Sequence, residues 1–159
     1  MRRAIQLLLA ISLCGVFTSA QESTAPAPQA DSQASQSAQS SKATVYVYRY
    51  KQFMGAALNP SVYCDEQELA RMDNGRYFAV KVDAGKHSFR SNDKQANIEI
   101  DTKAGQKYFI RVEIASGLMK GHGRVVLMAP EQGEPEIKRL KPLESSDVRD
   151  HERVALPTF

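Results

Sequence analysis

The side chains that most often carry chemistry are few in this sequence and widely spaced. The chain has three histidines and two cysteines, namely His87, His122, His151, Cys14 and Cys64. A zinc site needs at least three clustered ligands, and no two of these histidines have metal-ligand spacing. His87 shares a strand face with Phe89, which favours a position in the core or at its edge. The sequence therefore predicts no metal site and no cofactor.

His122 has the most suggestive surroundings of the three histidines. It lies between Gly121 and Gly123, with Lys120 and Arg124 close by. Flanking glycines let a backbone approach a ligand closely, and neighbouring cations can hold an anion. Two interpretations follow, which are an anion or glycan contact at this loop and a basic loop tip that has no ligand.

Motifs for nucleophilic or phosphate chemistry are absent from the sequence. It contains neither the G-x-S-x-G nucleophile elbow nor the G-x-x-x-x-G-K-[ST] phosphate loop. Carboxylates at Asp65, Glu99, Asp101 and Glu113 could meet in space, but on strands with a solvated face such residues usually point to water. The sequence therefore predicts a protein that is not an enzyme.

Two long interruptions of the strand pattern, residues 51–60 and 116–124, carry apolar side chains that a solvated turn does not need. Either these loops pack over an open end of the fold, or they form a contact surface. Met or Phe mixed with Lys or Arg is typical of protein interfaces, so we expect the two loops to lie near each other and to form any functional surface. The candidate binding residues are Lys51, Phe53, Met54, Lys120, His122 and Arg124.

Residues 1–20 have the organisation of a secretory signal peptide. Arg2 and Arg3 precede an apolar run over residues 4–17, and small residues follow it. Cleavage is expected between Ala20 and Gln21. The run is shorter than the roughly 20 apolar residues of a membrane-spanning helix, so we expect no membrane span after the signal is removed.

Lipoprotein processing, with an anchor at Cys14, is the alternative. Residues 11–14 (ISLC) resemble a lipobox, although Leu13 stands where lipoprotein signals have Gly, Ala or Ser. If the signal peptide leaves, Cys64 is the single thiol of the mature chain and cannot form an intramolecular disulfide. Cys64 shares a strand face with Val62, which predicts a free, buried thiol that packs as a small hydrophobe.

Composition divides the rest of the chain into three parts. Residues 21–42 are rich in Gln, Ser, Ala and Pro and predict a disordered linker, because they cannot bury enough apolar surface to offset their ordering entropy. Residues 43–143 form the folded domain, and the charged residues 144–159 are expected to be a flexible tail. The formal net charge of +3 falls to +1 once the two N-terminal arginines are removed, which leaves no basic footprint for nucleic acid.

Apolar residues recur with a period of two between residues 43 and 129, which is the period of a β-strand. Val45 and Val47 alternate with Tyr46 and Tyr48, so both faces of that strand are apolar or aromatic. The expected strands are 44–50, 61–65, 68–73, 76–82, 86–91, 96–101, 106–115 and 124–129. Residues 136–140 fit either a short helix that opens at Pro135 or an edge strand. The predicted fold class is all-β, an antiparallel β-sandwich of about seven to nine short strands.

Several short segments in this order resemble a bacterial family known as domain of unknown function 2846. They are residues 44–49 (TVYVYR), 59–63 (NPSVY), 74–78 (NGRYF), 84–87 (AGKH), 105–112 (GQKYFIRV) and 120–123 (KGHG). The resemblance covers about residues 43–143. It implies a secreted protein or lipoprotein with a sandwich of the prealbumin or immunoglobulin type, and it brings no catalytic residues with it.

These observations favour a secreted or periplasmic protein of the cell envelope that acts as a non-catalytic binding or accessory module. Its partner would be a protein or glycan of the envelope. Two alternatives remain at this point. One is a hydrolase with a site built from the 51–60 and 116–124 loops, and the other is a purely structural accessory domain.

Overall fold

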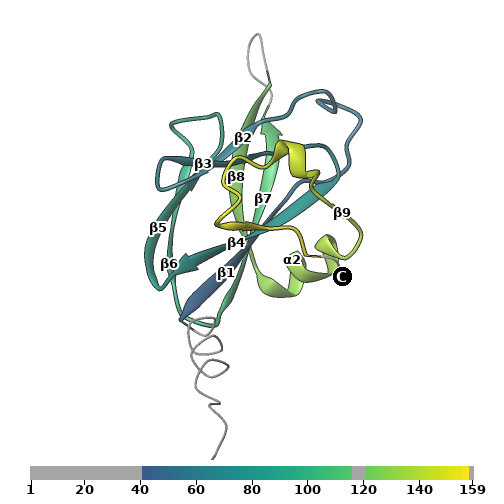
Figure 1. Cartoon of the computed structure of the whole chain (residues 1–159). Coiled ribbons are helices and arrows are strands. Elements are labelled where there is room, and N and C mark those ends of the chain that lie inside the picture. The colour runs from purple at the N-terminus through teal and green to yellow at the C-terminus, as the bar shows by residue number, and fades with distance from the viewer. Residues whose placement is uncertain (1–40, 116–120, 158–159) are drawn as a thin grey trace, which may run out of the picture.

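The larger of two sheets is built around β1 (Lys42–Tyr48), in a computed structural model that describes residues 41–115 and 121–157 (Figure 1). The neighbours of β1 along this sheet are β4 (Arg76–Asp83) on one side and β7 (Lys107–Ala115), then β8 (His122–Met128), on the other. β1 pairs antiparallel with β4, and β7 pairs antiparallel with β8. β1 and β7 run parallel. The sequence predicted a purely antiparallel sandwich, and this part of the prediction is wrong. Parallel neighbours need a long crossover, and the chain supplies it by passing through the second sheet before β7.

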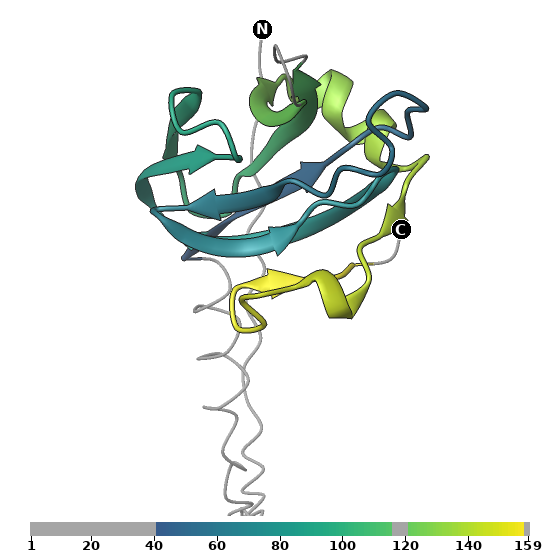
Figure 2. The same cartoon turned by 90° about the horizontal axis from the view of Figure 1, so that it is seen from above.

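The second sheet contains four short antiparallel strands in the order β3-β2-β5-β6. Their bounds are β2 Ser61–Cys64, β3 Gln67–Arg71, β5 Gly85–Arg90 and β6 Asn97–Thr102. The eight strands predicted from the sequence lie within two residues of the observed ones. The two sheets form separate layers (Figure 2), and the all-β sandwich is confirmed.

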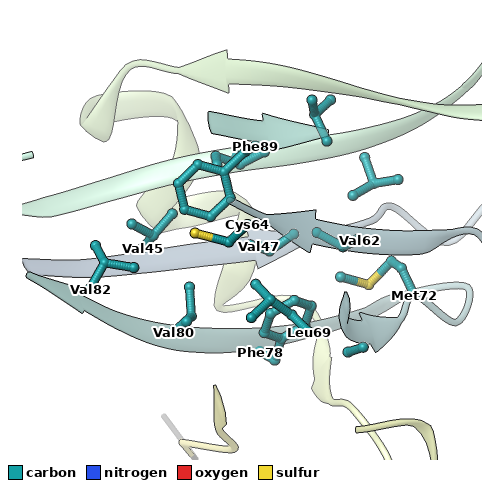
Figure 3. Close-up of a cluster of buried hydrophobic side chains, with 14 of the residues drawn as sticks. Val45, Val47, Val62, Cys64, Leu69, Met72, Phe78, Val80, Val82 and Phe89 are labelled. Atoms are coloured by element: carbon teal, nitrogen blue, oxygen red, sulfur yellow. The ribbon is translucent and has the colours of Figure 1, made fainter. Parts of the chain in front are cut away.

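The main core fills the space between the two sheets. Val45 and Val47 of β1, Phe78, Val80 and Val82 of β4, and Val62, Cys64 and Phe89 of the second sheet are all buried there (Figure 3). These side chains occupy alternate positions on each strand, because successive residues of a strand point to opposite faces. The period of two in the sequence therefore follows from this single apolar layer.

A short helix covers the opposite face of the larger sheet. α2 (Pro130–Ile137) begins with proline at its first turn, where a missing N–H is tolerated. It buries Ile137 against Tyr48, Tyr77 and Phe109. A Cβ atom on Gly133 would lie 2.5 Å from the Phe109 side chain, so glycine permits the close approach. The sequence left residues 136–140 open between a helix and an edge strand, and in the structure residues 136–137 end this helix while residues 138–140 form the turn after it. The helix starts at Pro130, earlier than expected, because the chain leaves β8 at Met128.

Residues 141–157, here called the C-terminal strap, run along the edges of both sheets (Figures 1 and 2). The strap contains β9 (Lys141–Pro142), a 3-10 turn (Ser145–Asp147) and β10 (Val154–Ala155). β9 and β10 pair with β4, and Val148 forms a bridge to Ala70 of β3. The flexible tail expected from residue 144 is therefore wrong for residues 144–157. This docking cannot be predicted from the sequence, because isolated apolar residues within a charged segment give no periodic pattern.

Residues 1–40 and 158–159 lie outside the described residues, and so do the expected signal peptide, its cleavage site at Ala20 and most of the linker. Within residues 41–115 and 121–157, no helix is long and apolar enough to cross a bilayer.

Docking of the strap can be tested at Val148, whose side chain is only 4% exposed. The Val148→Ala substitution should lower the free energy of unfolding by about 1.5–3 kcal/mol, because it removes buried methyl groups and leaves a cavity. Glu152→Ala, at an exposed position of the same strap, should change it by less than about 0.5 kcal/mol. Urea unfolding of both variants measures the difference. Equal stability of the two would mean that the strap does not stabilise the domain.

Candidate functional site

The described end of the second candidate loop, residues 121–124, lies against the end of the first. A Cβ atom built on Gly121 would lie 3.0 Å from Leu58, and one built on Gly123 would lie 2.5 Å from Pro60. Glycine at both positions therefore permits the close approach of β8 to the first loop. Residues 116–120, and with them Lys120, lie outside the described residues.

Arg49 holds the first loop in place from inside the fold. Its side chain is 1% exposed, and its guanidinium donates hydrogen bonds to the carbonyl oxygens of Leu58, Gly55 (2.7 Å) and Met72 (3.3 Å). Burial lowers the pKa of Arg49, opposed by the charge of Asp73. A buried cation is costly unless hydrogen bonds replace its water, so the loop carbonyls and the arginine fix each other.

The tip of this loop is fully presented to solvent. Phe53 is 101% exposed and Met54 is 81% exposed, and Lys51 beside them is exposed as well. Behind the tip, backbone hydrogen bonds run from Ala56 to Phe53 and from Leu58 to Gly55. Gly55 has a φ of 74°, which glycine adopts without strain. The result is an apolar tip on an internally bonded loop.

His122 and Arg124 lie near this loop but are paired with carboxylates. His122 Nε2 lies 3.5 Å from Asp93 Oδ2, and Arg124 Nη2 lies 3.5 Å from Glu113 Oε2. Both side chains remain substantially exposed. Among the described residues, the predicted side chains therefore do not converge on one pocket.

A polar pocket of about 290 Å³ opens beside this region, and its lining includes Tyr50, Gln52, Arg111 and Glu113. Arg111 Nη2 lies 2.5 Å from Glu113 Oε1, and Arg111 Nη1 lies 3.9 Å from Glu136 Oε2. The sequence named Glu113 as a possible carboxylate. Glu136 could not be predicted from the sequence, because it belongs to α2 and the sequence did not decide whether residues 136–140 form a helix or a strand.

Glu136 of α2 is the centre of a half-buried hydrogen-bond network between the helix and the sheet. It accepts hydrogen bonds from the hydroxyl of Tyr48 and from Gln132 Nε2 (3.0 Å). Burial opposes its ionisation, but the bonds from Tyr48, Tyr50 and Gln132 and the charge of Arg111 prevail and hold its pKa below the usual value. Burial and the bond to Glu136 raise the pKa of Tyr48. These shifts describe an ionised carboxylate that helps to fasten the helix to the sheet.

A second constellation joins Cys64, Asp65 and His87 at one side of the smaller sheet. The Cys64 thiol donates to Asp65 Oδ2, with 3.4 Å between Sγ and the oxygen, and His87 Nδ1 lies 2.7 Å from the same oxygen. The backbone N–H of Ser88 donates to Asp65 Oδ1 at 2.9 Å, and Arg153 Nη2 of the strap lies 3.1 Å from Cys64 Sγ. One ligand atom from each of the first three residues lies within 4.8 Å of the others.

The turn that presents Asp65 has an unusual backbone. Asp65 and Glu66 have φ values of 51° and 67°, the left-handed region that a two-residue hairpin turn requires and that Asn-Gly normally fills. Glu66 is held by Arg90, whose Nη2 lies 2.7 Å from Glu66 Oε2, and Arg90 lies 3.9 Å over the Tyr63 ring. Such outliers are often found at functional positions.

The burial of Cys64 is confirmed, since its side chain is 0% exposed and the thiol is free. Burial raises its pKa to about 12, although Arg153 opposes the shift. The sequence predicted that no three possible metal ligands lie together, and the cluster of Cys64, Asp65 and His87 shows that this prediction is wrong. The sequence does not reveal the cluster, because the β2–β5 pairing that joins residues 64 and 87 is a tertiary feature.

This geometry defines the class of the protein as a two-sheet β-sandwich with a helix that covers the larger sheet. Residues 39–125 match the family described as "Protein of unknown function (DUF2846)", and the chain belongs to that family. This confirms the resemblance drawn from the sequence. The match includes Cys64, Asp65, His87 and both candidate loops, whereas α2 and the strap lie beyond it.

The chain is similar to an uncharacterized protein of Haemophilus influenzae, with 28% identity over 98 residues. The alignment covers 60% of this chain and 58% of the relative, so it spans less than two thirds of that protein's length. No solved structure matches the chain.

The accessibility of Cys64 can be tested by thiol labelling in a Cys14→Ser background. At pH 8 the folded protein should react about three orders of magnitude more slowly than the denatured chain, because burial suppresses the thiolate and blocks access. Replacement of Cys64 with Ser should cost about 1–3 kcal/mol if the hydroxyl lacks a partner. Rapid, stoichiometric labelling of the folded protein would contradict the buried position.

The lowered pKa of Glu136 makes its contribution to stability dependent on pH. Glu136→Gln should lower the free energy of unfolding by about 1–2 kcal/mol at pH 7, where the folded state gains from hydrogen bonds to a charged acceptor. That difference is present above the ordinary glutamate value of 4.5 and should shrink as the pH falls through the lower folded value. Chemical unfolding at several pH values measures it. Glu134→Gln, which removes an exposed pair with Lys138 on the same helix, is the control and should show little dependence on pH.

Proposed function

We propose that this protein is a non-catalytic binding module of the cell envelope that contacts a partner protein through the tip of the 51–60 loop. The observation that carries the proposal is the full exposure of Phe53 and Met54 on a loop fixed by buried Arg49. An exposed phenylalanine gains nothing in the folded monomer, whereas burial at an interface would recover about 1.5–3 kcal/mol.

The surroundings of the tip have the composition of an interface rim. Exposed Lys51 adjoins it in the chain, and exposed His122 and Arg124 belong to β8, whose first residues pack against the end of the same loop. Interfaces are enriched in aromatic residues, Met and Arg. A fixed loop also loses little conformational entropy on binding. Phe and Met together favour a protein partner over a glycan, because a methionine side chain offers a sugar no hydrogen bond and packs well into apolar pockets.

The charge arrangement of the polar pocket supports a role other than catalysis. A general acid near neutral pH needs a raised carboxyl pKa, and the pKa of Glu136 is lowered. Arg111 approaches Glu136, and its positive charge favours the ionised form of that carboxylate. In the second constellation, the His87 ring contacts Asp65 and the Asp83 carbonyl, so the ring does not serve as a base toward the Cys64 thiol. Among the described residues, these two clusters therefore favour the binding role over the hydrolase alternative.

The proposed location rests on the sequence. The expected signal peptide over residues 1–20 would export the chain to the periplasm or beyond, and the linker over residues 21–42 would hold the domain away from a membrane or a partner. Processing at Cys14 would instead leave a lipid-anchored form with the same domain.

The proposal predicts that the loop tip carries the binding energy. In capture from envelope extract, the full-length double variant Phe53→Ser/Met54→Ser should retain at most about a tenth of the partner, because buried aromatic anchors typically dominate an interface. Its thermal transition should be nearly unchanged, since exposed substitutions shift stability by less than about 0.5 kcal/mol.

The matched control is Leu127→Ser, which removes another exposed apolar side chain, 48% exposed, from β8. It should leave capture intact. A second variant, His122→Ala/Arg124→Ala, should weaken capture by a smaller factor because rim charges contribute less. Undiminished capture by the Phe53/Met54 variant would remove the loop from the binding surface and favour a structural accessory role. If the Phe53/Met54 variant instead lost a glycan that the parent protein captures, the ligand would be a sugar and not a protein.

A further inference from the structure

The ring of His87 faces a hydrogen-bond acceptor at each nitrogen. Nδ1 lies 2.7 Å from the Asp65 carboxylate, and Nε2 lies 2.9 Å from the carbonyl oxygen of Asp83. A neutral imidazole carries one N–H and one lone pair. With the proton on Nε2, the Nδ1 lone pair therefore faces a carboxylate oxygen. Either a second ring proton or a metal ion bound at Nδ1 removes this conflict.

Cys64 adds a third donor of a different kind to the same point. Its Sγ atom lies 3.4 Å from Asp65 Oδ2, and the ligand atoms of Cys64, Asp65 and His87 all lie within 4.8 Å of one another. In a tetrahedral zinc site, bonds of about 2.0–2.3 Å place neighbouring ligand atoms roughly 3.3–3.8 Å apart. The three atoms therefore need movements of only about 1 Å to share one ion.

We propose that Cys64, Asp65 and His87 bind a divalent transition-metal ion of the zinc type, with water as a further ligand. A thiolate, an imidazole and a carboxylate together suit Zn²⁺, whereas Mg²⁺ and Ca²⁺ prefer oxygen alone. The bond from His87 Nε2 to the Asp83 carbonyl is the outer contact that metal-binding histidines usually make, and it leaves Nδ1 free to bind the metal. The 43% exposed side chain of Asp65 provides an opening for the ion.

Arg153 is the group that a metal ion must displace, because its Nη2 lies 3.1 Å from Cys64 Sγ. The structure holds an alternative partner for it. Asp150 Oδ2 is buried and has no hydrogen-bond partner in the described part of the chain, and Arg153 Nε already lies 4.0 Å from that oxygen. A small rotation would move the guanidinium from the sulfur to this carboxylate.

The charges also balance in the metal-bound form. The Cys64 thiolate and the Asp65 carboxylate together neutralise a divalent ion, and Asp150 neutralises Arg153. Both Arg153 and Asp150 belong to the C-terminal strap, so metal binding at the smaller sheet would change a contact of the strap. The competing reading is a protonated His87 paired with Asp65 and no metal, and the experiment separates the two.

The test uses the untagged full-length chain with Cys14→Ser, titrated with Co²⁺ as a spectroscopic substitute for Zn²⁺. The expected result is one Co²⁺ per chain with a thiolate-to-cobalt charge-transfer band. His87→Gln and Asp65→Asn should each weaken binding by about 100-fold or more, since loss of even an outer-shell partner costs 10–100-fold. His122→Gln removes a comparable histidine beside a carboxylate that has no thiol nearby, and it should bind like the parent.

A thermal measurement keeps the proposal testable if a variant folds poorly. Zn²⁺ at a hundredfold excess over its Kd should raise the midpoint of the parent by on the order of 10 °C, and it should leave His87→Gln unshifted. The absence of a thiolate band, an equal response of His87→Gln and the parent, or an equal loss in His122→Gln would overturn the site and leave an ion pair between His87 and Asp65.

Discussion

The need to bury both faces of β1 organises the whole domain. Hydrogen bonds from β4 and β7 hold the strand on its two edges, so its side chains can only point up or down. Val45 and Val47 require the second sheet on one side, and Tyr46 and Tyr48 require a cover on the other. α2 provides that cover although it contains Gly133 and Pro135, residues of low helix propensity. Its packing against Phe109 therefore outweighs its intrinsic preference.

Three consecutive residues at the end of the same strand each contact a different part of the candidate surface. Tyr48 reaches Glu136 and fastens the helix. Arg49 turns into the interior and ties down the loop that presents Phe53. Tyr50 lines the polar pocket beside Arg111. Three consecutive positions thus connect the core, the exposed tip and the pocket, because the alternation of a strand sends neighbouring side chains in different directions.

The C-terminal strap completes the sandwich where the two sheets leave open edges. It pairs with β4 and reaches β3 through Val148, so backbone groups that would otherwise invite foreign strands are covered. The same segment brings Arg153 to the thiol of Cys64. The strap therefore also borders the constellation of Cys64, Asp65 and His87, and a change in the contacts of Cys64 can affect how the strap docks.

The sequence by itself determined the two-layer β class, the strand positions to within two residues and the burial of Cys64, because these depend on a local period of two. It also indicated the two loops, whose apolar residues break that period. The tertiary structure alone decided the rest. The parallel pairing of β1 with β7, the helix over Tyr48 and the docking of Val148 depend on which distant segments meet. So does the meeting of Cys64 with His87 and of Arg49 with the carbonyl of Leu58. No local pattern records them, since the residues involved are neighbours only after the chain has folded.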